Sequence, residues 1–369
     1  MDAAIICSIF VLLPAKAIGY CFLVNRHRLI GPFTVASAFL QLIYVGSNIV
    51  SLVYGINSVV EAASRAGTLA LINLAPLYFS THLSFLADIF GVSLATYRQL
   101  HRSCGLVAVA HVIFHGAFAL AHRSHLTKEV SSTDWYSLIG AIAMILLVLL
   151  SISFFRKRWY EIFLRLHQTL SIAVMVFVIR HLISVPDFQW IPVYIFIGIF
   201  FSLAAFYIMI LIYRNTKLGK NFARLRATGK DGIMTAIIEM PRPLIINPGQ
   251  YLNIWVPSLS LFSSHPFTVT SWAPFPQEKV ELLIEERSGF TAKLFRHSCK
   301  TQNGYRVFFS GPHGSSIPDW EFDSVLIFAT GFGIATILPY LIKLCHGYKE
   351  RKGRSKRIHL VWKVYLVGE

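Results

Sequence analysis

Four histidines stand in two equally spaced pairs within the apolar first half of the chain. His115 follows His101 by fourteen residues, and His181 follows His167 by the same interval. On an α-helix, fourteen residues advance about 1400°, which leaves the second side chain roughly 40° from the first and roughly 21 Å further along the axis. Each pair therefore lies on one stripe of its helix.

Two such helices placed side by side would bring the four imidazoles together at two levels. Each level could hold a metal macrocycle by both of its axial positions. A haem held in this way has no open position for a substrate, so the pattern predicts electron transfer. His111 has no counterpart of matching spacing on the second helix, and we expect it and His82 to be ordinary histidines of the bundle.

The elements that position these histidines are predicted to be membrane helices. Of the 369 residues, 55% are hydrophobic and only 14% are charged, which is unusual for a soluble protein. A span needs roughly 20 apolar residues. The sequence predicts an all-α membrane bundle of about seven transmembrane helices, at residues 3–24, 33–56, 67–90, 99–121, 135–155, 160–184 and 190–213. The histidine pairs lie on the fourth and sixth runs.

Basic residues flank alternate ends of these runs and predict the orientation. The positive-inside rule assigns the basic connections to the cytosol and the N-terminus to the outside. The fourth and sixth runs then both pass from the cytosol outwards. We therefore expect His101 to pair with His167 near the inner face, and His115 with His181 near the outer face. The basic connections contain Arg26 and Arg28, Arg98 and Arg102, Arg156 to Arg158, and Arg214 with Lys217 and Lys220.

The first run has a second interpretation. The stretch 15–17, Ala-Lys-Ala, is similar to a signal-peptide cleavage site. Cleavage there would leave six spans and would invert the positive-inside pattern, and Asp2 stands where a leader usually carries a basic residue. We favour a retained first helix.

The formal net charge of +16 raises the question of nucleic-acid binding. The Lys and Arg residues lie mainly at the ends of apolar runs and in the C-terminal third, and they form no basic groove interleaved with aromatic residues. Basic flanks of membrane helices explain this charge, so we expect a lipid bilayer as partner and no nucleic acid. The five cysteines have no metal-binding or disulfide spacing and are expected to be buried thiols.

The composition changes after Lys220, where short strand-like segments replace the long apolar runs. Segments at 233–239, 251–256, 266–271, 279–285 and 305–310 predict a small antiparallel barrel. The stretch 289–291, Gly-Phe-Thr, precedes a helical segment at 292–298. Such a helix start offers free backbone N–H groups to a phosphate.

The last segment reads as a nucleotide-binding βα unit. An apolar strand at 323–329 leads into the glycine-containing turn 330–335, a helix to about residue 345 and a second strand at 358–364. Two strands are too few for a complete dinucleotide-binding domain. The predicted domains are 1–214 in the membrane (core about 67–213), 215–318 as the barrel, and 319–369 as an incomplete α/β nucleotide-binding domain.

In combination, these features resemble the ferric reductase and NADPH oxidase superfamily of transmembrane flavocytochromes b, and most closely its fungal ferric or cupric metalloreductases. The resemblance runs from about residue 67 to the C-terminus. The stretch 160–163 leading into His167 resembles the approach to the second ligand helix, and 101–102 resembles the start of the first. The resemblance implies that His101, His115, His167 and His181 ligate two b-type haems.

The same resemblance assigns cofactor-binding stretches in the second half, which would be a ferredoxin-reductase-like FAD barrel and a partial Rossmann-like domain. His313 and Thr330 depart from the family pattern, which has Tyr and Gly there. The flavin stretch comprises His265, Pro266, Phe267, Thr268, Val269 and Ser271; the pyrophosphate stretch comprises Gly289, Phe290 and Thr291; the two nicotinamide-nucleotide stretches comprise Gly311, Pro312 and Gly314, and Gly331, Gly333 and Ile334.

The implied function is transfer of electrons from cytosolic NADPH through FAD and both haems to an extracytoplasmic ferric or cupric chelate or siderophore, in a multi-pass protein of the plasma membrane. Family members continue well past Trp362, which puts NADPH binding and activity in question if the chain ends at Glu369. The alternatives are a superoxide-generating NADPH oxidase and a truncated, non-catalytic haem and FAD protein that acts through a full-length partner. A transporter without redox chemistry is disfavoured by the histidine spacing.

Overall fold

The computed structural model describes residues 35–79, 82–123, 132–219, 222–260, 263–287, 289–298, 304–317, 322–351 and 353–364. The chain divides into two compact units. The first comprises Met1–Leu86 and Ala95–Leu203, and the second comprises Ala87–Leu94 and Ala204–Glu369. The predicted first run at 3–24, with its cleavage alternative, lies outside the described residues.

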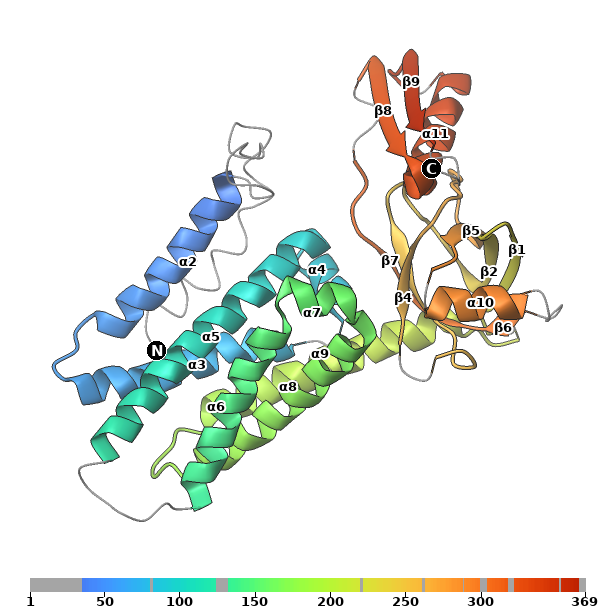
Figure 1. Ribbon diagram of the computed structural model, residues 1–369. Helices are drawn as coiled ribbons and strands as arrows, with labels where there is room; N and C mark the ends of the chain where they lie inside the picture. The colour runs from blue at the N-terminus through green and yellow to red at the C-terminus, as the bar shows by residue number, and fades with distance from the viewer. Residues whose placement is uncertain are drawn as a thin grey trace. The chain divides into compact units, whose positions relative to one another are not determined.

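Helices make up the membrane half of the chain (Figure 1). Their lengths follow the apolar runs, although α4 and α7 are short. They are α2 (Val35–Val53), α3 (Val59–Tyr78), α4 (Leu83–Ile89), α5 (Leu94–Arg123), α6 (Ser132–Leu150), α7 (Ser153–Arg158), α8 (Tyr160–Ile183) and α9 (Ile191–Asn215).

Four of these helices are long and apolar enough to cross a membrane: α2, α5, α8 and α9. The pair α3 and α4 would add a fifth span if it crosses as one element, but it is bent by 97°. Pro76 lies two residues before the end of α3 and lacks the N–H that continues a helix. The apolar part of α6, Trp135–Leu150, is shorter than a full span. The described residues thus contain four to five spans, and seven remains a prediction.

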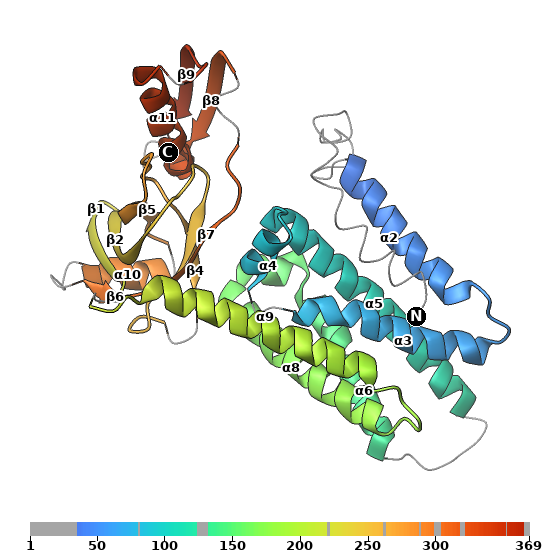
Figure 2. The same cartoon turned by 180° about the vertical axis from the view of Figure 1, so that it is seen from behind.

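Small and branched side chains pack the first unit. The apolar cluster includes Ala108 of α5 and Val174 of α8, both fully buried. Helix α6 lies along α8 (Figure 2). Most large side chains of α9 remain exposed, as expected for a helix that faces lipid. The rest of the buried cluster is Leu74 of α3 with Ala143 and Met144 of α6.

The second unit contains two antiparallel sheets, ordered β5-β2-β1-β6 and β4-β3-β7. A single bridge between Val269 and Leu282 connects them. The five predicted strand segments form strands, but a closed barrel is not shown. The strands are β1 (Arg224–Lys230), β2 (Ile233–Leu244), β3 (Tyr251–Trp255), β4 (His265–Thr268), β5 (Gln277–Glu285), β6 (Tyr305–Arg306) and β7 (Phe308–His313).

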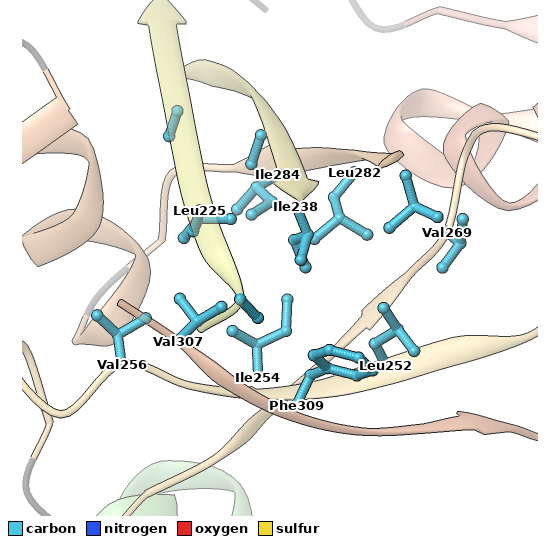
Figure 3. Packing of buried hydrophobic residues seen from close by; sticks show 14 of the residues in the cluster. Leu225, Ile238, Leu252, Ile254, Val256, Val269, Leu282, Ile284, Val307 and Phe309 are labelled. Atoms are coloured by element: carbon cyan, nitrogen blue, oxygen red, sulfur yellow. The ribbon is translucent and has the colours of Figure 1, made fainter. Parts of the chain in front are cut away.

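One close-packed core holds these sheets together. Inward-pointing side chains of β1, β2, β3 and β5, among them Leu225, Ile238, Leu252 and Leu282, form one buried cluster with Phe309 of β7 (Figure 3). Each such side chain contributes roughly 1.5–3 kcal/mol when it is fully buried. Helix α10 (Phe290–Ser298) adds its apolar side to the same core.

The end of α9 joins this unit through one amide side chain. Asn215 is fully buried, its Nδ2 donates to the carbonyl of Phe309 at 2.8 Å, and its Oδ1 accepts from the Phe309 N–H at 2.9 Å. Asn215 thereby satisfies both backbone groups of a β7 residue, as a neighbouring strand would.

The last elements form the predicted βα unit. Strand β8 (Ser324–Thr330) leads through the turn η3 (Gly331–Gly333) into α11 (Ile334–Lys349), and β9 (Arg357–Lys363) pairs with β8 in parallel. Helix α11 lies beside this strand pair (Figure 1). The indole N–H of Trp362 donates to the Gly331 carbonyl at 2.9 Å and fixes the glycine turn.

Candidate functional site

The structure brings the four histidines together in the predicted combination. Helix α5 carries His101 and His115, and α8 carries His167 and His181. The ring centroids of His101 and His167 are 6.2 Å apart, and those of His115 and His181 are 6.1 Å apart. Each helix carries its two histidines on one stripe and fourteen residues apart, so the two pairs lie at separate levels of the same two helices.

These separations fit a metal held between two imidazoles. A metal–imidazole nitrogen bond is about 2 Å long, and the ring centre lies roughly 1 Å behind the nitrogen, so two axial rings have centroids roughly 6 Å apart. The described residues contain no cluster of three or more His, Cys, Asp or Glu side chains that could hold a metal ion. A metal macrocycle that supplies its own equatorial ligands needs only the two axial ones.

The hydrogen bond of His115 fixes its tautomer. Its Nδ1 lies 2.8 Å from the backbone carbonyl oxygen of Ala63. A carbonyl can only accept a hydrogen bond, so Nδ1 carries the proton. In a neutral imidazole the lone pair then resides on Nε2, which is the state that a metal ligand requires.

A glycine makes room for the same ring. A Cβ at Gly67 would lie 3.1 Å from Nδ1 and 3.2 Å from Cε1 of His115. The imidazole can therefore approach the backbone of α3 only because residue 67 has no side chain.

The other histidines differ in the surroundings of their second nitrogen. Nδ1 of His181 lies 2.8 Å from the hydroxyl oxygen of Ser137 on α6. Nδ1 of His167 is buried and has no hydrogen-bond partner among the residues that the structure describes.

An apolar layer separates the two levels. Ala108 and Val174 each follow the first histidine of their helix by seven residues, and both are fully buried. His111, one turn before His115, is buried with its Nε2 3.4 Å from Oδ1 of Asn48. This contact fits the expectation of an ordinary bundle histidine.

The predicted flavin and pyrophosphate stretches lie together in the second unit. His265 of β4 stacks on Phe290 of α10 with ring centroids 4.4 Å apart and planes 15° apart, and the ring centroid of Phe267 lies 6.1 Å from that of the same phenyl ring.

Gly289 directly precedes α10 and has a positive φ of 80°. The Thr291 hydroxyl bonds both backbone groups of Arg287. Pro266 and Thr268 pair with β3.

Val269 and Ser271 form hydrogen bonds that stabilise the sheet. Val269 is buried in the core, and its N–H donates to the Gln250 carbonyl at 3.1 Å. The Ser271 hydroxyl accepts from the backbone N–H of Glu281 at 3.0 Å. Their contacts with neighbouring strands position the motif, and a direct contact with a flavin stays a prediction.

The turn 249–250 lies beside the first predicted nicotinamide-nucleotide stretch and beside helix α11. The Gln250 amide donates to the Gly314 carbonyl at 3.1 Å, at the end of β7. A Cβ at Gly249 would lie 2.4 Å from the hydroxyl of Tyr340 in α11, the helix that Ile334 begins. Gly311 and Gly314 have positive φ angles of 118° and 91°, and Pro312 stands between them at the end of β7. Gly331 and Gly333 form the turn before α11.

A hydrogen-bonded series in the second unit was not predicted from the sequence. His313 Nδ1 lies 2.5 Å from Asp88 Oδ2, and its Nε2 lies 3.0 Å from the Ser310 hydroxyl. The Gly314 N–H donates to the other Asp88 oxygen at 3.3 Å. The order Ser-His-Asp is that of a hydrolase triad, but Ser310 is buried in β7 and stands too deep to meet a substrate. The series therefore fixes the loop after β7.

Comparison with known proteins gives two family matches in separate parts of the chain. Residues 66–178 match the family described as ferric reductase like transmembrane component, and residues 218–317 match an FAD-binding domain family. The first match includes His101, His115 and His167 and ends before His181.

The chain is also similar to curated proteins of fungi. It is 28% identical over 291 residues to ferric/cupric reductase transmembrane component 2 of Saccharomyces cerevisiae, a match that covers 76% of the chain and 40% of that protein. It is 25% identical over 338 residues to a probable cell surface ferric reductase, kap2, of Aspergillus oryzae, which covers 81% of the chain and 43% of that protein. The chain thus spans about two fifths of the length of these relatives.

Among solved structures, the cytochrome P450 reductase GcoB of Amycolatopsis aligns with 39% of the chain and 43% of its own length, at 18% identity and a TM-score of 0.32.

Proposed function

Because the chain belongs to the family of ferric reductase transmembrane components with an FAD-binding domain, we propose that it passes electrons from cytosolic NADPH, by way of FAD and two b-type haems, to a ferric or cupric chelate on the other side of the membrane. One observation carries this proposal. The imidazole rings form two pairs, with ring centroids 6.2 and 6.1 Å apart within each pair, on two helices that are long enough to cross a membrane.

The histidines hold the haems in this proposal. His101 with His167 and His115 with His181 would each hold one haem, and with two histidines bound neither haem would have a position for a substrate, so both would serve only to carry electrons. When bound, haem and FAD supply the one-electron and hydride chemistry that side chains lack. The buried apolar cluster that includes Ala108 and Val174 lies between the two levels, so each haem would have its own site.

The FAD-binding domain orients the flavin through a few groups. Thr268 is proposed to contact the flavin ring, and the residues before it, His265 to Phe267, the ribityl and phosphate region. The stacked ring of Phe290 fixes the position of His265. The free N–H groups at the start of α10, after Gly289, are proposed to bind the pyrophosphate. The glycine turns at 311–314 and 331–334 are proposed to receive NADPH.

From the basic connections we propose that the FAD-binding domain lies in the cytosol and the N-terminus outside, with seven spans in the whole bundle. His101 and His167 then lie at the level near the flavin, and His115 and His181 at the level near the acceptor. We retain the domain bounds 1–214, 215–318 and 319–369, and we place the protein in the plasma membrane.

Vesicles test this function directly. The full chain, loaded with haem and FAD, is reconstituted into sealed liposomes that enclose a ferric chelate and a ferrous indicator. Only molecules with an outward FAD-binding domain can react with NADPH added outside. We expect the enclosed indicator to develop its ferrous colour, and His115→Ala to abolish the signal.

Three other results would contradict the proposal. Superoxide formation without any chelate would indicate an oxidase. Haem that stays oxidised with NADPH but is reduced by dithionite would exclude NADPH as the donor for this chain. A preparation without bis-histidine haem would remove the electron path altogether.

A further inference from the structure

The two histidine pairs differ in what their second ring nitrogens contact. In the pair His115 and His181, both Nδ1 atoms lie 2.8 Å from an oxygen, one on Ala63 and one on Ser137. In the other pair, the buried Nδ1 of His167 has no hydrogen-bond partner within the described residues. The oxygens come from α3 and α6, so the packing of the bundle itself creates this asymmetry.

We propose that Ser137, together with the Ala63 carbonyl, is a positioning group that lowers the reduction potential of the haem held by His115 and His181. This inference rests on the proposed function, because it requires that these histidines ligate a haem. It assigns a role to Ser137 in addition to those of the ligands themselves.

The direction of the Ser137 hydrogen bond follows from the chemistry of ligation. A histidine that binds iron through Nε2 uses the lone pair of that atom, so its single proton resides on Nδ1. The Ser137 hydroxyl oxygen then accepts from His181, as the Ala63 carbonyl accepts from His115. Both axial ligands of this haem would thus donate a hydrogen bond to a fixed oxygen.

Such acceptors change the electronic character of the ligand. A hydrogen bond from Nδ1–H raises the basicity of the coordinated imidazole. A more basic ligand stabilises Fe(III) relative to Fe(II), so the potential of the one-electron couple falls, while no bond is formed or broken. His115 and His181 would thus make a haem held here a stronger reductant than it would be without these two acceptors, which would favour transfer to an acceptor that is hard to reduce.

Gly67 supplies a second, independent way to test the arrangement. A Cβ at this position would lie 3.1 Å from Nδ1 of His115, closer than the ring can tolerate without moving. Gly67→Ala should therefore disturb the hydrogen bond to Ala63. Gly116→Ala is a matched control, because Gly116 adjoins the same ligand and its Cβ would meet nothing within 4 Å.

The experiment is a potentiometric titration of the haem absorbance in the purified full chain, with dithionite as reductant and ferricyanide as oxidant. We expect two components in the wild type. Ser137→Ala should shift one component to higher potential and leave the other unchanged. Ser137→Thr, which keeps the hydroxyl, should restore the wild-type value. Gly67→Ala should shift the same component that Ser137→Ala shifts.

The control for Ser137→Ala is Ser151→Ala, because the Ser151 hydroxyl donates to the Leu147 carbonyl one turn earlier, at the end of α6, at 2.7 Å. Two unchanged potentials in Ser137→Ala, with haem content and spectrum intact, would overturn this inference alone. An equal shift in Ser151→Ala would also overturn it. A wild-type chain without a bis-histidine haem spectrum would overturn the proposed function and this inference together.

Discussion

The two units of the chain position their candidate sites in different ways. In the first unit, the histidine pairs lie on two straight helices, and the interval of fourteen residues fixes their relative positions. In the second unit, His265 meets Phe290 only after two strands, a turn and a helix have folded around a common core. The first kind of site depends on helical periodicity, and the second depends on tertiary packing. Changes to single residues should therefore have separable effects in the two units.

Removal of one ligand should have the largest effect. His115→Ala should lower the haem content of the purified chain from two to about one, because a haem with a single axial histidine lacks half of its protein ligands. His101→Ala should remove the other haem. His111→Ala is the matched control, since His111 lies on the same helix and contacts Asn48.

Haem analysis after denaturation, alongside the absorbance spectrum, measures this effect. Loss of both haems from one substitution, or loss of haem from the His111 variant, would show that the two levels are not separate sites.

A substitution that creates a cavity in the core of the second unit should leave both haems bound to the first unit. Phe309 is fully buried, and Phe309→Ala should lower the free energy of unfolding of this unit by about 3–5 kcal/mol. The exposed Phe275 offers the control, for which a change within about 0.5 kcal/mol is expected. Thermal release of flavin, followed by fluorescence, reports the change. A simultaneous loss of haem would contradict the separation of the two units.

Loss of the Asp88 carboxylate should have a smaller effect on the same unit. Asp88→Ala leaves the buried His313 ring and the Gly314 N–H without their acceptor, at a cost of about 1–3 kcal/mol. The same flavin-release measurement detects it. Unfolding at the wild-type temperature would mean that the series through His313 does not hold the loop after β7.

The smallest effect concerns an ion pair at the surface of β2. The hydrogen bond from Lys279 lowers the pKa of Glu239 below its ordinary value of 4.5, and the charges of Arg226, Lys279 and Arg224 act in the same direction, while burial opposes them. The resulting stabilisation is present in full above pH 4.5 and disappears as the pH falls through the lowered pKa.

Because Lys279 is well exposed, Glu239→Gln should cost less than about 1 kcal/mol at pH 7. Denaturant unfolding of the wild type and the variant at several pH values should show the difference decreasing below pH 4.5. A difference that grows in acid would contradict the assigned sign.

The histidine pairing was predictable because it needs only the interval between the residues, the geometry of an α-helix and the direction of each span, which the basic flanks indicate. The strand 233–239 was predictable from its alternation, whereas β1 was not, since most of its outward positions are basic and its inward ones include small residues such as Ala227. The bend between α3 and α4 and the short α6 depart from the seven regular runs that the composition predicted.

The groups around the ligands could not have been found from the sequence. Ser137 precedes His181 by 44 residues, and Asp88 precedes His313 by 225. No local pattern links such distant positions, because their contacts depend on how whole helices and strands pack. The sequence around Gly67 did not indicate its role either, since that role depends on the position of the His115 ring.

The central claim is that two imidazole pairs, His101 with His167 and His115 with His181, each hold one haem. A low-temperature electron paramagnetic resonance spectrum of the oxidised full chain, combined with a haem count, tests it most directly. The account predicts low-spin signals of bis-imidazole iron from two haems per chain. A chain without haem, or one with high-spin iron that has an open axial position, would contradict it.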